Sequence, residues 1–162
     1  MIKLSTRQVF MLGFISCLSM LAVGAYFQLV ESLEPCPLCI SQRIAIAATG
    51  LIFLIAALHN PQQKGQQYYA VFSSLTALIG SGISARHVWL QNLPADEVPE
   101  CSPGLDYIFE NFPLTETLKL MLNGTGECAD VLWTLFGLSI PAWTFLAFIG
   151  LAALNIKAFL KT

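Results

Sequence analysis

Long apolar runs alternate with short polar segments along the chain. Four of these runs reach, or come close to, the roughly 20 residues that a helix needs to cross a bilayer. They cover residues 8–30, 40–58, 68–90 and 140–160. The second run reaches this length only if Arg43 extends its charged end to the membrane surface. The pattern predicts an all-α membrane protein, a bundle of four transmembrane helices.

The composition supports the same class of protein. Hydrophobic residues make up 56% of the 162 residues and charged residues only 11%, whereas a soluble domain carries about 25% charged residues. We therefore expect one integral membrane domain over residues 1–162. The chain has no basic patch or nucleic-acid motif, which excludes a nucleic-acid partner.

The first apolar run has an alternative interpretation as a signal peptide, because Ala22-Val23-Gly24 resembles a small-residue cleavage site. The run continues to Val30, however, which is long for the apolar part of a signal peptide. We therefore expect an uncleaved first helix. Cys17 lies inside it and is expected to be a small buried hydrophobic residue.

Basic residues predict the orientation. Close to the predicted helices, basic residues occur at the two termini and in the 59–67 turn: Lys3, Arg7, Lys64, Lys157 and Lys161. Cytoplasmic loops are rich in lysine and arginine, so both termini should be cytoplasmic and loops 31–39 and 91–139 should face outward. Four of the five cysteines lie in these outer loops. The outer side is oxidising, so we expect disulfides rather than metal-bound thiolates.

A C-x-x-C motif, Cys36-Pro37-Leu38-Cys39, ends the first outer loop. This spacing can close a disulfide, contribute half of a zinc site or carry electrons. A helix that starts near Leu38 would place Cys39 in its first turn and Arg43 one turn later on the same face. The helix N-terminus and the guanidinium would both favour a thiolate at Cys39. A structural disulfide beside an interfacial arginine remains the alternative.

The second outer loop holds Cys101 and Cys128. Between them, apolar residues at helical spacing followed by Asn123-Gly124 predict a short amphipathic helix: Leu114, Leu118, Met121 and Leu122. We expect this helix to lie on the outer membrane surface. Either arm of the loop is long enough to bring its cysteines to the first pair, where thiolate attack could exchange disulfides.

These features together resemble the DsbB family of membrane thiol oxidases, over nearly the whole chain. The most specific matches are the decapeptide Glu34–Arg43, and Cys128 followed by Phe136-Gly137-Leu138-Ser139-Ile140-Pro141-Ala142-Trp143. His87 matches a family histidine near the outer end of the third helix. The resemblance implies four helices in the bacterial inner membrane, cytoplasmic termini and two cysteine pairs in the outer loops.

The resemblance also implies a relay of disulfides. A periplasmic thioredoxin-fold dithiol protein of the DsbA type would attack the Cys101–Cys128 disulfide at Cys101. The released Cys128 would then attack Cys36, and Cys39 would leave as a thiolate.

In this family the electrons pass on to a membrane quinone, either ubiquinone or menaquinone. The resemblance places Arg43 and His87 beside the quinone ring, whereas His87 by itself would be interpreted as an interfacial histidine next to Trp89. Arg86 is not assigned to the site.

Three other functions are possible. A vitamin K epoxide reductase-like enzyme should carry its C-x-x-C after a late helix, whereas here the motif lies between the first two. A protein that carries reducing equivalents outward needs a cysteine pair within the membrane, and Cys17 is alone there. A zinc-stabilised membrane protein would need four cysteine ligands, but the second pair lacks the short spacing of most structural zinc sites. We therefore expect no metal.

Overall fold

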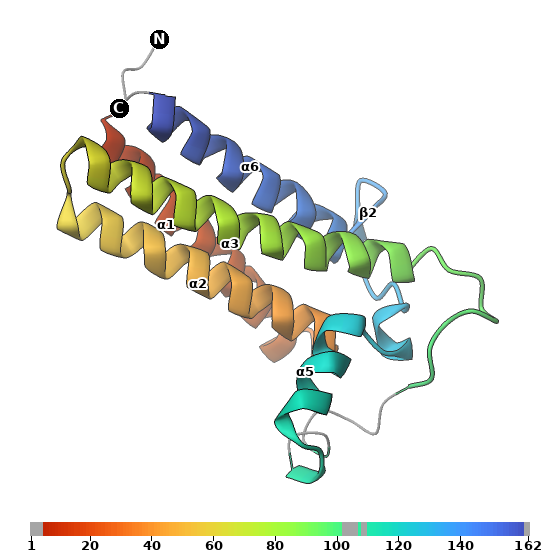
Figure 1. The fold of residues 1–162 in the computed structure, drawn as a ribbon. Helices are drawn as coiled ribbons and strands as arrows, with labels where there is room; N and C mark the ends of the chain where they lie inside the picture. The colour runs from red at the N-terminus through yellow and green to blue at the C-terminus, as the bar shows by residue number, and fades with distance from the viewer. Residues whose placement is uncertain (1–4, 102–106, 108–109, 161–162) are drawn as a thin grey trace.

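The computed structural model describes residues 5–101, 107 and 110–160, with side chains up to residue 156. Lys3 and Lys161 of the charge pattern, and part of the segment between Cys101 and Cys128, lie outside these residues. Four long helices form a bundle (Figure 1): α1 (Thr6–Leu29), α2 (Pro37–His59), α3 (Gln63–Leu90) and α6 (Ile140–Leu160). The second outer loop contributes α5 (Leu114–Asn123), the 3₁₀ turn η1 (Gly126–Cys128), and the strands β1 (Thr134–Leu135) and β2 (Leu138–Ser139).

The bundle has two distinct ends. The described ends of the chain and the turn between α2 and α3 lie at one end, and α5, η1 and the β hairpin gather at the other (Figure 1). Among the described residues, α1, α2 and α3 are long and apolar enough to cross a membrane, and α6 carries a shorter apolar stretch, Ile140–Ile156. The fold is that of a multi-pass α-helical membrane protein.

Buried aromatic side chains fill the middle of the bundle. Phe10 and Phe53 pack with ring centroids 6.3 Å apart, and Phe148 is fully buried between helices. Cys17 belongs to the same core cluster and is 1% exposed, which confirms its prediction as a small buried residue. Small residues at helix contacts let the backbones approach closely, which drives packing where lipid replaces water.

Polar side chains inside the bundle bond across helices. Thr49 Oγ1 donates to Thr76 Oγ1 at 2.9 Å, which joins α2 to α3. Ser73 Oγ donates to Asn155 Oδ1 at 3.0 Å, which joins α3 to α6. Such hydrogen bonds add to the packing of helices in a membrane.

Two helices begin earlier than the apolar pattern predicts. The apolar run begins at residue 40, whereas α2 begins at Pro37, which agrees with the start near Leu38 expected from the C-x-x-C motif. Cys36 caps the helix, and proline suits a first helical turn. α3 begins at Gln63 rather than residue 68, since glutamine and lysine propagate a helix well even though they are polar. The apolar run therefore marks the part of α3 suited to the bilayer, not the whole helix.

The predicted helix between Cys101 and Cys128 is confirmed as α5, whose C-terminal part meets the start of α2 at the end of the bundle (Figure 1). Its buried face carries Thr117 and Met121, and the backbone oxygen of Met121 accepts a 2.8 Å hydrogen bond from Ser41 of α2. Three leucines on α5 are exposed: Leu114, Leu118 and Leu122. An exposed leucine row on a helix with polar neighbours fits a helix that lies on the membrane surface.

A glycine contact between α3 and α6 gives a test of this packing. A Cβ atom on Gly80 would lie 2.2 Å from Cζ of Phe148, whereas one on Gly82 would meet nothing within 4 Å. Overpacking a core costs about 1–3 kcal/mol, so Gly80→Ala should lower the thermal unfolding temperature in detergent. Gly82→Ala is the matched control and should leave the temperature unchanged or raise it, because alanine favours a helix. Equal effects of the two substitutions would contradict the α3–α6 contact.

Candidate functional site

Cys36 and Cys39 lie at the N-terminus of α2. Cys36 is the N-cap, and its Sγ accepts a hydrogen bond from the backbone N–H of Cys39 at 3.4 Å. The two sulfur atoms are 3.2 Å apart, within hydrogen-bond distance. The N-terminus of a helix favours negative charge, so this position suits a cysteine that becomes a thiolate.

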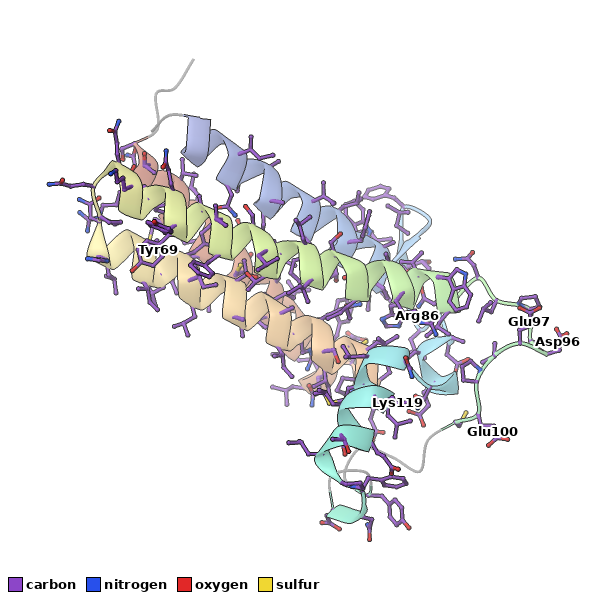
Figure 2. The ribbon with its side chains drawn as sticks, in the orientation of Figure 1. Tyr69, Arg86, Asp96, Glu97, Glu100 and Lys119 are labelled. Carbon is purple, nitrogen blue, oxygen red and sulfur yellow. The ribbon has the colours of Figure 1, made fainter. Side chains whose placement is uncertain are left out.

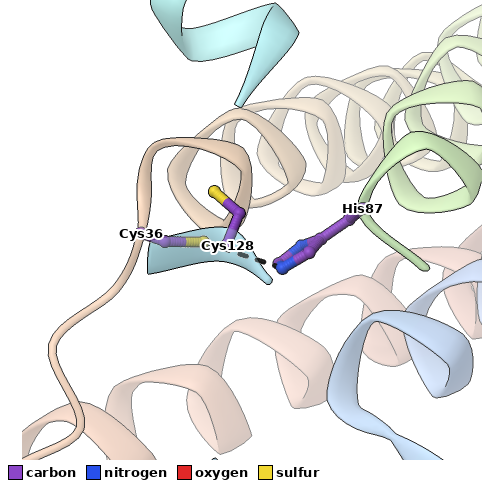
Figure 3. Close-up of side chains that lie close together, drawn as sticks. All are labelled: Cys36, His87 and Cys128. Carbon is purple, nitrogen blue, oxygen red and sulfur yellow. Dashed lines mark hydrogen bonds between the residues drawn. The ribbon is translucent and has the colours of Figure 1, made fainter. Parts of the chain in front are cut away.

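The turn η1 brings Cys128 to the first pair. The Sγ atoms of Cys36 and Cys128 and a ring nitrogen of His87 all lie within 4.8 Å of one another (Figure 3). Cys128 is fully buried in a small cluster with Leu38 and Leu90. The cysteine predicted to attack Cys36 therefore lies beside it, although 91 residues separate them in the sequence.

Gly124 allows this close approach. It has a φ of +79°, and a Cβ atom there would lie 2.6 Å from methyl carbons of both Leu38 and Leu90. Only glycine combines a left-handed backbone with the absence of a side chain. The sequence predicts Gly124 as a helix stop, but not that it lets the loop pack against α2 and α3.

Cys101, unlike Cys128, is not buried. It is exposed, and its segment is held alongside η1 by a 3.1 Å hydrogen bond from the backbone N–H of Gly126 to the oxygen of Glu100. A Cβ atom on Gly126 would lie 3.0 Å from Cys101 Sγ. Asp96, Glu97 and Glu100 lie on the same outer segment (Figure 2). The second cysteine pair therefore has one solvent-facing member and one buried member.

Hydrogen bonds among the thiols shift the pKa values of Cys36 and Cys128 in opposite directions. The Cys36 thiol is hydrogen-bonded to Cys128 and to Cys39, and together with burial these bonds raise the pKa of Cys36 above its ordinary value. The bond from Cys36 lowers the pKa of Cys128 to about 6, and the backbone N–H groups of Thr125 and Leu38 favour the thiolate further. The two backbone donors do not depend on the Cys36 proton, and a thiolate is the reactive form in disulfide exchange.

His87 is buried, with 2% of its surface exposed. Its Nδ1 lies 3.2 Å from the amide nitrogen of Gln42, within hydrogen-bond distance. Nε2 is 3.8 Å from Cys36 Sγ, within reach of a weak hydrogen bond to sulfur. No sequence pattern predicts this contact of Gln42, because its partner comes from another helix.

A cavity of about 430 Å³ adjoins Cys39 on the side of α1. Its lining includes Cys39, Gln42 and Arg43 from α2, and apolar side chains such as Met20, Val23, Phe27, Ile46, Trp133 and Trp143. Arg43 donates through one guanidinium nitrogen to the backbone oxygen of Gly24 at 2.8 Å and through the other to Gln28. A largely apolar cavity with a few polar groups suits a flat organic ligand. His87 is not among the described lining residues; Gln42 lies between it and the cavity.

Two other polar residues have structural contacts. Arg86 donates to the backbone oxygen of Asn123 at 3.3 Å and lies 4.4 Å above the ring of Trp89. It thereby holds the end of α5, consistent with its exclusion from the predicted site. His59 lies at the opposite end of the bundle, 3.0 Å from the hydroxyl of Tyr69.

The cluster of Cys36, His87 and Cys128 could also hold a metal ion, since soft thiolate and imidazole ligands suit zinc. Cys39 would be the candidate fourth ligand, with its sulfur 3.2 Å from that of Cys36. The absence of a bound metal in the working protein stays a prediction.

Helices suited to membrane spans and a cluster of thiols are features of a thiol oxidoreductase of the membrane. The family model described as disulfide bond formation protein DsbB matches residues 6–158, and the chain belongs to the DsbB family. Disulfide bond formation protein B of Nitrosococcus oceani is 56% identical over 154 residues, which cover 95% of this chain and 91% of the relative. The protein of the same name from Methylococcus capsulatus is 55% identical, over 94% of this chain and 93% of the relative. Disulfide bond formation protein B 1 of Pseudomonas aeruginosa is 43% identical, over 97% and 96%.

Substitution of Gly124 tests the contact between the two cysteine pairs. In a background with Cys39→Ser and Cys101→Ser, mild oxidation should join Cys36 to Cys128. Gly124→Ala should slow this cross-link about tenfold or more, because the clash with Leu38 and Leu90 costs on the order of 1–3 kcal/mol.

Gly137→Ala is the matched control. Gly137 has the same φ of +79° but open space around its Cβ position, so the substitution strains the backbone without moving Cys128. Cross-linking is measured by mass spectrometry of the linked peptides. Equal rates in both variants would show that Gly124 does not hold Cys128 in place.

Proposed function

We propose that the protein is a disulfide-generating thiol:quinone oxidoreductase of the bacterial inner membrane. It reoxidises a periplasmic thioredoxin-fold dithiol protein of the DsbA type and delivers the electrons to a membrane quinone, ubiquinone or menaquinone. The observation that carries this proposal is the placement of the Cys128 sulfur within 4.8 Å of Cys36. Cys39, the partner of Cys36, in turn lines an apolar cavity. Cys128, Cys36 and Cys39 therefore form a continuous path from the outer loop to that cavity.

The first exchange takes place at the solvent-facing cysteine. A thiolate of the dithiol protein attacks Cys101, the Cys101–Cys128 bond breaks, and Cys128 leaves as a thiolate. The exposure of Cys101 supports this direction, because a protein partner can reach Cys101 but not the buried Cys128. The second thiol of the partner later attacks the mixed disulfide, which releases Cys101 as a thiol and the partner as a disulfide.

The second exchange moves the disulfide inward. The Cys128 thiolate attacks Cys36, the Cys36–Cys39 bond breaks, and Cys39 leaves as a thiolate in the first turn of α2. The position of Cys39 at the helix N-terminus stabilises this leaving group. Nε2 of His87 lies 3.8 Å from the Cys36 sulfur, so we assign His87 a positioning role there. Its predicted place beside the quinone ring stays a prediction.

The cavity beside Cys39 fits a quinone. Its apolar walls suit the ring, and Arg43 supplies a charge-assisted hydrogen-bond donor for a quinone oxygen. Cys101 would then attack Cys128, which restores the Cys101–Cys128 disulfide and frees Cys36. The Cys36 and Cys39 thiols would give up two electrons and two protons to a bound quinone, the electron acceptor, and re-form their disulfide. Arg43 holds its guanidinium in place through Gly24 and Gln28, so the donor is preorganised at the cavity wall.

Both termini are proposed to be cytoplasmic. The described ends of the chain lie at the same end of the bundle as the α2–α3 turn (Figure 1). That end carries Arg7 and Lys64, as the positive-inside rule requires for a cytoplasmic side.

Quinone reduction by the purified protein tests the proposed function. Under anaerobic conditions, a reduced thioredoxin-fold dithiol protein should yield one quinol per dithiol oxidised. Cys101→Ser and Cys128→Ser should block transfer from the dithiol protein, while Cys36 and Cys39 can still form their disulfide. Cys36→Ser and Cys39→Ser should stop electron delivery to quinone. Unchanged turnover in all four single variants would show that the cysteines have only a structural role.

Arg43 offers a second test, because its fork spans two acceptors that a lysine ammonium cannot reach with the same geometry. Arg43→Lys and Arg43→Ala should both raise the apparent Michaelis constant for quinone. Loss of one charge-assisted hydrogen bond corresponds to about 1.5–3 kcal/mol, or roughly ten- to hundredfold. Arg86→Lys is the matched control, since Arg86 lies outside the described cavity lining. Full activity of the Arg43→Lys variant would show that Arg43 only marks the membrane interface.

A further inference from the structure

The β hairpin after Cys128 has an unusual tip. Phe136 and Gly137 join β1 to β2, with φ angles of +52° and +79°. Two successive left-handed residues form the tight turn that matches the twist of a hairpin, and asparagine or aspartate followed by glycine is the usual choice. A phenylalanine in this conformation costs roughly 1–2 kcal/mol. Phe136 is also 88% exposed, so no contact within the described chain offsets that cost.

The base of the hairpin is fixed to three helices. Nε1 of Trp143, on α6, donates to the backbone oxygen of Leu135 at 3.1 Å. Ser139 donates to the side chain of Gln91 at the end of α3 at 2.6 Å. The ring of Trp133 packs 5.0 Å from that of Phe27 on α1. The tip is therefore held in a set position, projecting from the side of the bundle beside the start of α6 (Figure 1).

The sequence on both sides of the tip carries no charge. No Asp, Glu, Lys, Arg or His occurs between Asp130 and Lys157, so the uncharged stretch includes the hairpin and α6 up to Ile156. Leu132 and Leu135 are exposed together with Phe136. Uncharged and mostly apolar residues thus run from α6 into the hairpin.

We propose that the hairpin tip inserts into the outer leaflet of the bilayer, with Phe136 among the acyl chains just below the headgroups. Burial of an exposed aromatic side chain in lipid contributes a few kcal/mol, enough to offset the strain at Phe136. A water-facing loop would gain nothing from this residue. The apolar continuity with α6 favours lipid over a protein partner as the occupant.

Insertion of the tip determines where the cavity opens. Leu132, Trp133 and Leu135 form the hairpin side of the cavity that contains Cys39 and Arg43. With the tip in lipid, this wall lies at the depth of the acyl chains, and an apolar ligand can pass sideways from the bilayer into the cavity. This consequence rests on the proposed function; the insertion itself does not.

Fluorescence quenching tests the insertion directly. The full-length protein with Phe136→Trp is reconstituted in phosphatidylcholine nanodiscs, and the fluorescence of the unsubstituted protein is subtracted. Lipids brominated on their acyl chains should quench the added signal, and acrylamide in the water should not. Ile149→Trp on α6 is the lipid-facing control, and Ala95→Trp beside Asp96 is the water-facing control.

Quenching of position 136 by acrylamide but not by brominated lipid, as for Ala95→Trp, would overturn the proposal. A second variant tests the consequence for the cavity. Phe136→Asp should raise the apparent Michaelis constant several-fold for a long-chain quinone in nanodiscs, but not for a short-chain quinone in detergent, and Phe136→Leu should change neither. An equal rise for both quinones would contradict lateral access. If the protein reduced no quinone at all, the proposed function would fail while the quenching result would still decide the insertion.

Discussion

The contact of the second outer loop with the N-terminus of α2 is the interaction on which the rest of the site depends. Leu38, Leu90 and Cys128 form a small buried cluster at this contact, and Gly124 allows the loop to approach. Burial of two leucine side chains contributes a few kcal/mol, enough to hold a loop whose own helices are short. Without this contact, nothing else in the described chain would hold Cys128 beside Cys36.

The same contact separates two environments. Cys101 remains in solvent, where a protein can reach it, while Cys128 is enclosed between its own turn and the first turn of α2. On the far side of that turn, Cys39 lines an apolar cavity. Thiol exchange requires sulfur atoms to meet, whereas a quinone is soluble only in lipid. A disulfide passed from Cys128 to Cys36 would link these two environments without movement of a charged group through the bilayer.

The sequence predicted well what depends on local patterns. Apolar runs located the four helices, the leucine spacing located α5, and Asn123-Gly124 located its end. Helix starts taken from the apolar runs were less accurate, because Cys36 caps α2 through its own sulfur and the polar start of α3 resembles a loop. The resemblance to a family supplied the order of the cysteines, which spacing alone left open. Contacts between distant elements were beyond prediction: Gln42 bonding to His87, and Gly124 packing on Leu38, depend on how helices meet.

A disulfide between Cys36 and Cys128 is the proposed intermediate that links dithiol oxidation to quinone reduction. Its most direct test is to mix the oxidised protein with a reduced dithiol protein and quinone, stop the reaction with acid at successive times, and identify disulfide-linked peptides by mass spectrometry. The account predicts a Cys36–Cys128 peptide that appears before quinol and disappears as quinol accumulates. Quinol formation at full rate without that peptide, or in a Cys128→Ser variant, would contradict it.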